Sequence, residues 1–192
     1  NAQQGVEAGT EIIWNYINRF NKPTLFVVNQ IDHENANFDM SFQSIVNLVG
    51  KNAVKIQYPL MVGGAQCIID ILKMKMYKFG PNGGKPQKLE IPADQAEIAN
   101  KLNNELVEKA AENDEELMEL FFEQGTLNEE EMRKGIQKGM INGELYPVFC
   151  VSALNDMGTG RLMGFIDHVA PAAADNKMEQ SVEGKDILAK VD

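Results

Sequence analysis

Two uninterrupted apolar runs constrain the fold of this chain more than any other feature of its sequence. Residues 24–28 and 146–151 are rich in β-branched and aromatic side chains, and each run leads into a polar loop and then a helix-like segment. A strand that is apolar on both faces is typical of a parallel sheet covered by helices. The two strand–loop–helix units therefore predict an α/β fold with a doubly wound parallel sheet.

The segment between these two units has a different pattern. Short strand-like runs alternate with glycine turns and lead into three amphipathic stretches; the expected strands cover residues 54–58, 67–72 and 74–79, and the expected helices cover 93–111, 114–122 and 128–142. We therefore expect a small mixed sheet with its own helices, inserted into the parallel fold.

The apolar spacing predicts which faces of the helices turn inward. Further helices are expected over residues 7–20, 38–49 and 160–169. The apolar lines are Ile12, Ile13, Tyr16, Ile17 and Phe20 in the first helix of the chain, Ile98, Leu102, Leu106 and Ala110 in the helix over 93–111, and Met132, Ile136 and Met140 in the helix over 128–142.

These patterns divide the chain into three parts. Residues 3–52 and 146–171 are expected to form one unit, and residues 53–145 an inserted α+β subdomain. Residues 172–192 are polar and alanine-rich, so we expect a linker toward a further domain. Asn1 and Ala2 are expected to be foreign to the fold, left by cleavage of a tag.

Composition limits the partners of the chain. The formal net charge is −10, and a strongly acidic chain has no electrostatic means to hold nucleic acid or an anionic membrane, although it can bind a basic protein. No apolar run approaches the length of a membrane span. Cys67 and Cys150 lie in apolar contexts, so we expect reduced, buried thiols in a soluble, cytoplasmic protein.

The loop after the first strand reads Asn29-Gln30-Ile31-Asp32. A carboxylate held there can accept two parallel hydrogen bonds, which suits the adjacent N1–H and N2–H donors of guanine; adenine lacks this pair. Asn29 would brace the loop. Taken alone the pattern is weak, because Asn-x-x-Asp after a strand is usually an ordinary turn.

The loop after the second strand begins Ser152-Ala153-Leu154. A small residue there lets a backbone N–H approach a base oxygen such as guanine O6. A Ser-Ala pair at the start of a loop is common, so this signal is also weak by itself. The two loops in this order, on two similar strands with a helix between them, are more specific.

Short motifs occur along the chain from Gly5 to about Pro171. They include Gly5-Val6-Glu7, Phe26-Val27-Val28-Asn29-Gln30-Ile31-Asp32, Gln57-Tyr58-Pro59-Leu60, Ile91-Pro92-Ala93 and Pro147-Val148-x-Cys150-x-Ser152-Ala153. Together they resemble the translational GTPases of the elongation factor G type. The resemblance implies part of a P-loop-GTPase-type sheet with the inserted subdomain described above.

The resemblance also assigns the two loops. It implies that Asn29, Gln30 and Asp32, with Ser152, Ala153 and Leu154, bind the guanine of GTP or GDP. The family usually has lysine where this chain has Gln30. The parent protein is expected to hydrolyse GTP on the ribosome during translocation. This chain lacks the phosphate-loop motif, both switch motifs and the Mg²⁺ ligands, so we expect no catalytic residue in it and no activity from it alone.

The family's inserted subdomain contacts the ribosomal stalk protein, which implies the same partner here through an acidic face at Glu112, Glu116 and Glu119. Two alternatives stay open. The parent could be a divergent paralogue with a degenerate nucleotide site, in which the insert chiefly docks onto the stalk, or a ribosome-protection or release-factor relative. His33 and His168 lack companions for a metal site, so we expect surface or packing roles.

Overall fold

The two predicted apolar strands pair side by side in a parallel sheet. The computed structural model describes residues 1–172, 179–180 and 186–187. Strand β1 (Phe26–Val28) pairs with β7 (Tyr146–Cys150), which also pairs with a third parallel strand, β2 (Ala53–Lys55). The sheet order is therefore β1-β7-β2, with β7 in the centre. The predicted parallel α/β fold is confirmed.

The two strands differ in burial. All five residues of β7 are buried because the strand has a neighbour on each side. Strand β1 has only three residues and one partner among the described strands, and Val27 is 39% exposed. The expectation that both strands are buried on both faces is wrong for β1 at Val27, because the faces of a sheet are covered by helices and cover is incomplete there.

The sequence suggested one strand over residues 54–58, and the structure divides this segment. β2 belongs to the parallel sheet, whereas β3 (Gln57–Val62) belongs to a second sheet. Ile56 stands between them, and its backbone N–H donates to the carbonyl oxygen of Val148 at 3.0 Å. The apolar run alone contains no signal for this division, because both pieces are buried.

The second sheet contains β3, β4 (Ala65–Asp70), β5 (Lys75–Gly80) and β6 (Gly83–Leu89) in that order. Each neighbouring pair is antiparallel, so the expected mixed sheet is wrong. Strand β6 was not predicted. Its sequence, GGKPQKL, is polar and contains a proline, and such strands are found at sheet edges.

Three helices follow the second sheet in the chain: α3 (Ala93–Ala111), α4 (Glu115–Gln124) and α5 (Glu129–Asn142). Helix α3 contacts both of the others. The side chains of Asp114 and Asn128 cap α4 and α5, and Asn128 forms a capping box with Glu131. Of the predicted inward faces, that of α5 is confirmed, with Met132, Ile136 and Met140 buried. In α3 the prediction fails at Ile98, which is 50% exposed.

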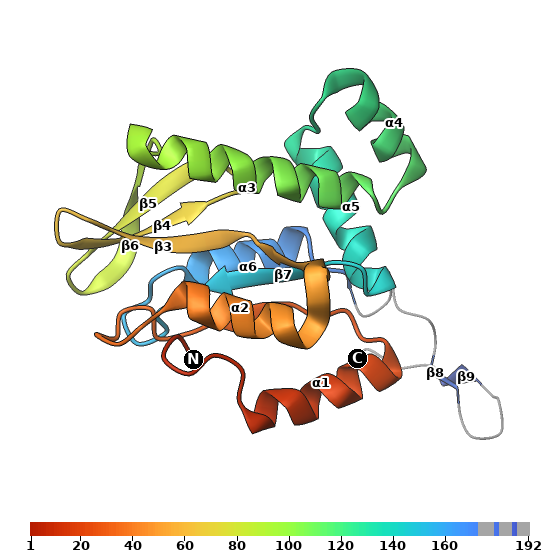
Figure 1. Cartoon of the computed structure of the whole chain (residues 1–192), viewed down its shortest axis with the longest axis horizontal. Coiled ribbons are helices and arrows are strands. Elements are labelled where there is room, and N and C mark those ends of the chain that lie inside the picture. The colour runs from red at the N-terminus through yellow and green to blue at the C-terminus, as the bar shows by residue number, and fades with distance from the viewer. Residues whose placement is uncertain (173–178, 181–185, 188–192) are drawn as a thin grey trace.

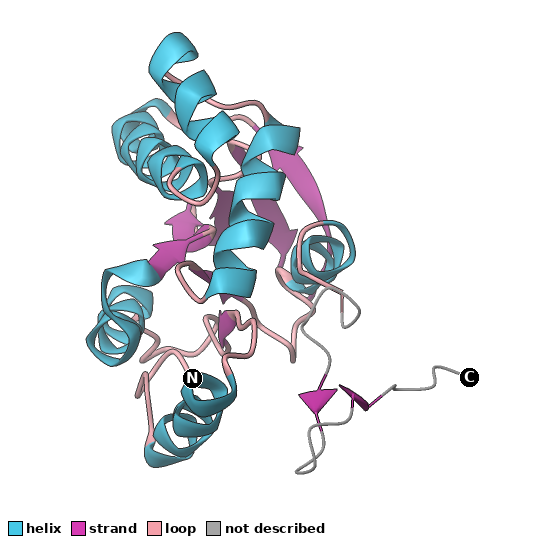
Figure 2. Cartoon of the chain, turned by 90° about the vertical axis from the view of Figure 1, so that its right-hand side faces the viewer, coloured by secondary structure: helices cyan, strands magenta, loops and turns pink. Residues whose placement is uncertain are grey.

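The helices α1 (Ala8–Phe20), α2 (Phe38–Val49) and α6 (Thr159–His168) accompany the parallel sheet, and a short 3-10 turn, η1 (Gly50–Asn52), follows α2. Both views place α1 at the opposite end of the molecule from α4 (Figures 1 and 2). No residue of α1 is buried, and its apolar line is open: Ile12, Ile13, Tyr16 and Phe20 are each more than half exposed. Trp14, which is half-buried, packs against the rings of Phe26 and Tyr146.

The first residues belong to the fold. Ala2 is fully buried, its N–H donates to the carbonyl oxygen of Asn29 at 2.8 Å, and its own carbonyl accepts from Asn37 at 2.7 Å. The expectation that Asn1 and Ala2 are foreign to the fold is therefore wrong. The expected linker over residues 172–192 lies mostly outside the described residues. The parts of it that are described include β8 (Glu179–Gln180) and β9 (Asp186–Ile187), which form an antiparallel pair.

None of the helices in the described part of the chain combines the length and apolar character that crossing a bilayer requires.

Candidate functional site

The loops after β1 and β7 lie next to each other at the carboxyl end of the parallel sheet. Val28 is in register with Cys150, and the N–H of Val151 donates to the carbonyl oxygen of Val28 at 3.0 Å. One step further, the N–H of Ile31 donates to the carbonyl oxygen of Val151 at 3.3 Å. Parallel strands bring the residues that follow them to one edge, where ligands of such sheets bind. The structure therefore brings the two sequence-predicted loops together.

The side chain of Asn29 joins the two loops. Its Oδ1 accepts one hydrogen bond from the N–H of Gln30 at 2.7 Å and a second from the N–H of Ala153 at 3.0 Å. Its backbone carbonyl accepts from Ala2. A single carboxamide oxygen thus fixes both loops relative to each other, and a side chain without this acceptor would leave the Ala153 N–H without its partner.

Asp32 is exposed and makes the second connection between the loops. Its Oδ2 accepts from the Nδ2 of Asn155 at 2.8 Å. A carboxylate offers about four lone-pair sites, so Asp32 keeps acceptor capacity after this bond. Sequence reasoning missed Asn155. Its position three residues after Ser152, in a loop expected to face Asp32, was the signal that could have found it.

Gln30 takes the left-handed backbone conformation, with φ +66°. Its side-chain Oε1 accepts from the Nε2 of Gln3 at 3.4 Å. The side chain is therefore tied to the N-terminal segment, and its contact with that segment involves no charged group.

The loop after β7 is a closed turn. Ser152 is fully buried, and its backbone exchanges two hydrogen bonds with Met157, both of 2.9 Å. The Ser152 Oγ accepts from the N–H of Asn155 at 3.2 Å. Leu154, at the tip, is 90% exposed. The side chain of Leu154 therefore packs little against the protein.

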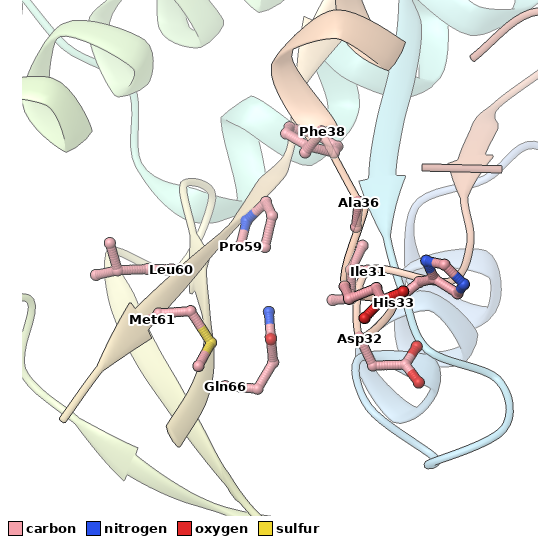
Figure 3. A pocket seen from close by; sticks show the side chains of 10 residues that line it. Ile31, Asp32, His33, Ala36, Phe38, Pro59, Leu60, Met61 and Gln66 are labelled. Carbon is pink, nitrogen blue, oxygen red and sulfur yellow. The ribbon is translucent and has the colours of Figure 1, made fainter. Parts of the chain in front are cut away.

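A cavity of about 370 Å³ lies beside Asp32. Figure 3 shows Pro59, Met61 and Gln66 of the β3–β4 hairpin on one side and Ile31 and Ala36 on the other, with the Asp32 carboxylate directed away from the hairpin. The loop from Ser152 to Leu154 does not line this cavity. Asp32 therefore separates two surfaces, the cavity and the exposed edge where the two loops meet.

Metal and thiol chemistry find no support in the part of the chain that the structure describes. His33 and His168 are exposed, as expected, and the described residues contain no group of three His, Cys, Asp or Glu side chains that could hold a metal ion. Cys67 and Cys150 are free and buried, which confirms the predicted reduced thiols. Burial raises the pKa of both thiols, so neither is a ready nucleophile.

The acidic face predicted from the sequence lies at the junction of two helices: Glu112 is the C-cap of α3, and Glu116 and Glu119 lie on α4. Glu112 pairs with Lys109, and Glu116 pairs with Lys134 at 3.2 Å. Glu119 is exposed on α4. Part of the negative charge is therefore already neutralised within the chain.

Comparisons with known proteins find one family and several similar proteins. The model of the elongation factor Tu GTP binding domain matches residues 1–172. Elongation factor G of Ureaplasma parvum serovar 3 is 33% identical over 178 residues, which cover 90% of this chain and 25% of that protein. Elongation factor G of Ureaplasma urealyticum serovar 10 gives the same values.

A crystal structure of a protein from Thermus thermophilus has a similar fold. Its TM-score is 0.80 at 26% sequence identity, and the match covers 91% of this chain and 26% of that chain. The chain thus spans about a quarter of the length of the relatives that it matches.

Proposed function

This chain belongs to the translational GTPases of the elongation factor G type, and we propose that its two polar loops recognise guanine in a ribosome-dependent GTPase that acts in translation elongation. The observation that carries the proposal is the pair of side-chain bonds between the loops, Asn29 to Ala153 and Asp32 to Asn155. These bonds hold an exposed carboxylate at the carboxyl end of a parallel sheet, where the ligands of such folds bind.

The residues present fit a guanine ring. The Asp32 carboxylate would accept from N1–H and N2–H of the base, and Asn155 would hold one of its oxygens in place. Asn29 keeps the loop after β7 at the distance that this requires. The Ala153 N–H is engaged with Asn29, so the Leu154 N–H is the donor that we assign to the base oxygen O6.

Gln30 stands where the family usually has lysine, whose stem covers the guanine face. The shorter, uncharged side chain offers less stacking area, so we expect weaker base binding than a lysine would give. The docking-module alternative rests on Gln30 alone.

We assign the phosphate contacts, the Mg²⁺ ligands and the catalytic step to residues other than these 192, because the sequence contains no phosphate-loop motif. Base contacts alone omit the largest part of nucleotide affinity. The 192-residue chain should therefore bind GDP weakly and hydrolyse no GTP.

We also propose a division of labour within the chain. Residues 3–52 and 146–171 would serve the nucleotide, and residues 53–145 would serve as an inserted subdomain, with β2 as the strand where the chain leaves the parallel sheet. The acidic face at Glu112, Glu116 and Glu119 would contact the basic surface of the ribosomal stalk protein. The net charge of −10 agrees with a protein partner and a cytoplasmic location, and we do not expect this chain itself to bind nucleic acid.

The test is Asp32→Asn in the full-length protein. The variant exchanges one acceptor for a donor, which should cost about 1–3 kcal/mol of discrimination for guanine and improve binding of XTP, since xanthine has an acceptor in place of the guanine amino group. Nucleotide affinities measured by calorimetric titration decide the outcome. Glu34→Gln, an exposed carboxylate of the same loop, is the matched control and should change nothing. An Asp32→Asn protein that keeps the wild-type preference for GTP over XTP refutes the assignment.

A further inference from the structure

The turn between β5 and β6 touches the loop of the candidate site at one residue. Gly83, with φ +69°, lies so close to Asn155 that an added Cβ would overlap the Asn155 carbonyl oxygen and lie 2.5 Å from its carbonyl carbon. A backbone group offers no flexible end that can move aside. Position 83 therefore admits only glycine, for its backbone angle and for this contact.

Asn155 is connected on its other side to Asp32. Its N–H donates to the Ser152 Oγ, and its side-chain Nδ2 donates to the Asp32 Oδ2 at 2.8 Å. The carbonyl of the same residue faces Gly83. Asn155 is thus a direct bridge between the antiparallel sheet and the carboxylate to which we assign base recognition.

The insert holds the segment after Asn155 as well. An added Cβ at Gly158 would lie 2.7 Å from the carbonyl oxygen of Cys150 on β7 and 2.9 Å from the Cδ1 of Ile68, so this glycine contacts β4 as well as the parallel sheet. Arg161 donates from Nε to the Oδ2 of Asp70 at 2.8 Å, its Nη2 lies 2.7 Å from the same oxygen, and Asp70 is fully buried. Residues 155, 158 and 161 each touch the second sheet, and the backbone contact between Gly83 and Asn155 is the one that leaves no room for a side chain.

We propose that the β5–β6 turn is a specificity element of the guanine site, in which Gly83 positions Asn155 and Asn155 in turn positions the Asp32 carboxylate. This inference rests on the proposed function of Asp32. Two parallel hydrogen bonds to a base require both carboxylate oxygens to lie in the plane of the ring, so a small shift of the group that holds one oxygen alters base discrimination before it alters phosphate binding.

The chain contains a matched control for Gly83. Gly84 also has a positive φ, of +80°, but nothing lies within 4 Å of a Cβ added there. Gly83→Ala and Gly84→Ala therefore impose a similar backbone strain, and only Gly83→Ala displaces Asn155. A difference between the two variants reports the contact itself.

The experiment compares both variants in the full-length protein by two measurements. The first is the ratio of GDP to IDP affinity, because hypoxanthine lacks the amino group that pairs with Asp32. We expect Gly83→Ala to lower this ratio on the order of tenfold and Gly84→Ala to leave it within about twofold. The second is hydrogen exchange at the Asn155 and Met157 amides, which should quicken in Gly83→Ala alone. Equal behaviour of the two variants overturns the proposal.

Asn155→Ala tests the same proposal without strain on the β5–β6 turn. If Gly83→Ala does not fold, this variant alone shows whether Asn155 positions the Asp32 carboxylate. It should lower the GDP to IDP ratio to the same extent, and the double variant should show no further loss, because both changes act through one bridge. If the losses of the GDP to IDP ratio add in the double variant, or if Asn155→Ala leaves the ratio unchanged, the proposal that Gly83 acts on Asp32 through Asn155 is overturned. A wild type that does not prefer GDP to ADP refutes the proposed function instead, and the exchange comparison then still decides whether Gly83 positions the loop.

Discussion

The two sheets of this protein are built differently. The insert, with the antiparallel sheet of β3 to β6 and the packed helices α3 and α5, contains fully buried side chains such as Ile69, Leu106 and Ile136. The parallel sheet has one fully buried strand, β7, and its companion helix α1 has no buried residue. The candidate site is built on the parallel sheet, where packing is sparser, and its second loop takes support from the other sheet. The insert therefore contributes to the site as a scaffold.

The largest predicted effect comes from cutting the strongest link between the two regions. Arg161→Ala leaves the Asp70 carboxylate buried without its ion-pair partner, which should cost about 3–5 kcal/mol of unfolding free energy. Urea denaturation of the 192-residue chain measures it. The control is Lys75→Ala, which removes a pair with the exposed Glu90 and should cost at most about 1 kcal/mol. Similar losses of unfolding free energy in the two variants would mean that the buried Arg161–Asp70 pair stabilises the protein no more than an exposed ion pair does.

A second pair of substitutions compares the two regions directly. Ile136→Ala on α5 removes a fully buried side chain and should destabilise the chain by about 2–5 kcal/mol. Ile13→Ala on α1 removes a side chain that is 58% exposed and should change stability by about 0.5 kcal/mol or less. Thermal and urea unfolding report both. A large loss in Ile13→Ala would show that α1 is packed in solution, and would remove the contrast between the regions.

Acid sensitivity should arise in the insert at Asp114. Lys138 and the N–H groups at the start of α4 lower the pKa of this buried carboxyl from 3.8 to about 2. A lowered pKa in the folded state stabilises the protein above the unfolded pKa, and this stability is lost as pH falls through the folded pKa. Asp114→Asn keeps an N-cap residue and should remove about 2 kcal/mol at pH 7.

The difference between wild type and Asp114→Asn should shrink as the pH falls from about 4 to about 2, because the wild-type carboxyl then takes up its proton. Urea titrations across this pH range measure it. Glu119→Gln, at an exposed position of the same helix, serves as the control and should follow the wild type. A constant difference down to pH 2 would show that the lost stability does not come from the charge of the Asp114 carboxylate.

The smallest effect concerns the outer face of the insert. Reversing the charge of Glu112, Glu116 and Glu119 should weaken binding to the C-terminal domain of the ribosomal stalk protein, and raised salt should do the same. The effect should be modest, because Glu112 and Glu116 already pair with lysines. Reversal of Glu7 and Glu11, near and on α1, is the control. Equal binding by both triple and control variants would leave the acidic residues as a solvated face.

Local signals in the sequence were enough for much of the fold. The helix over residues 93–111 was predicted with the bounds that the structure has, and the buried line of Met132, Ile136 and Met140 followed from helical periodicity. The two site loops were found for the same reason, since an apolar run and the polar residues after it are adjacent in the chain. The meeting of Asn29 with Ala153 then follows from parallel topology.

Contacts between distant segments were beyond the reach of such signals. Nothing in the residues around Gly83 indicates that it lies on the carbonyl of Asn155, and nothing around Asp70 indicates Arg161 as its partner. The exposure of Val27 and of the α1 face depends on which elements lie beside them, and the sequence pattern is the same whether such a face is covered or open. Periodicity and turn chemistry therefore determined the elements and the loops, whereas their burial, their pairing across the two sheets and the link from the insert to Asp32 were decided by tertiary packing.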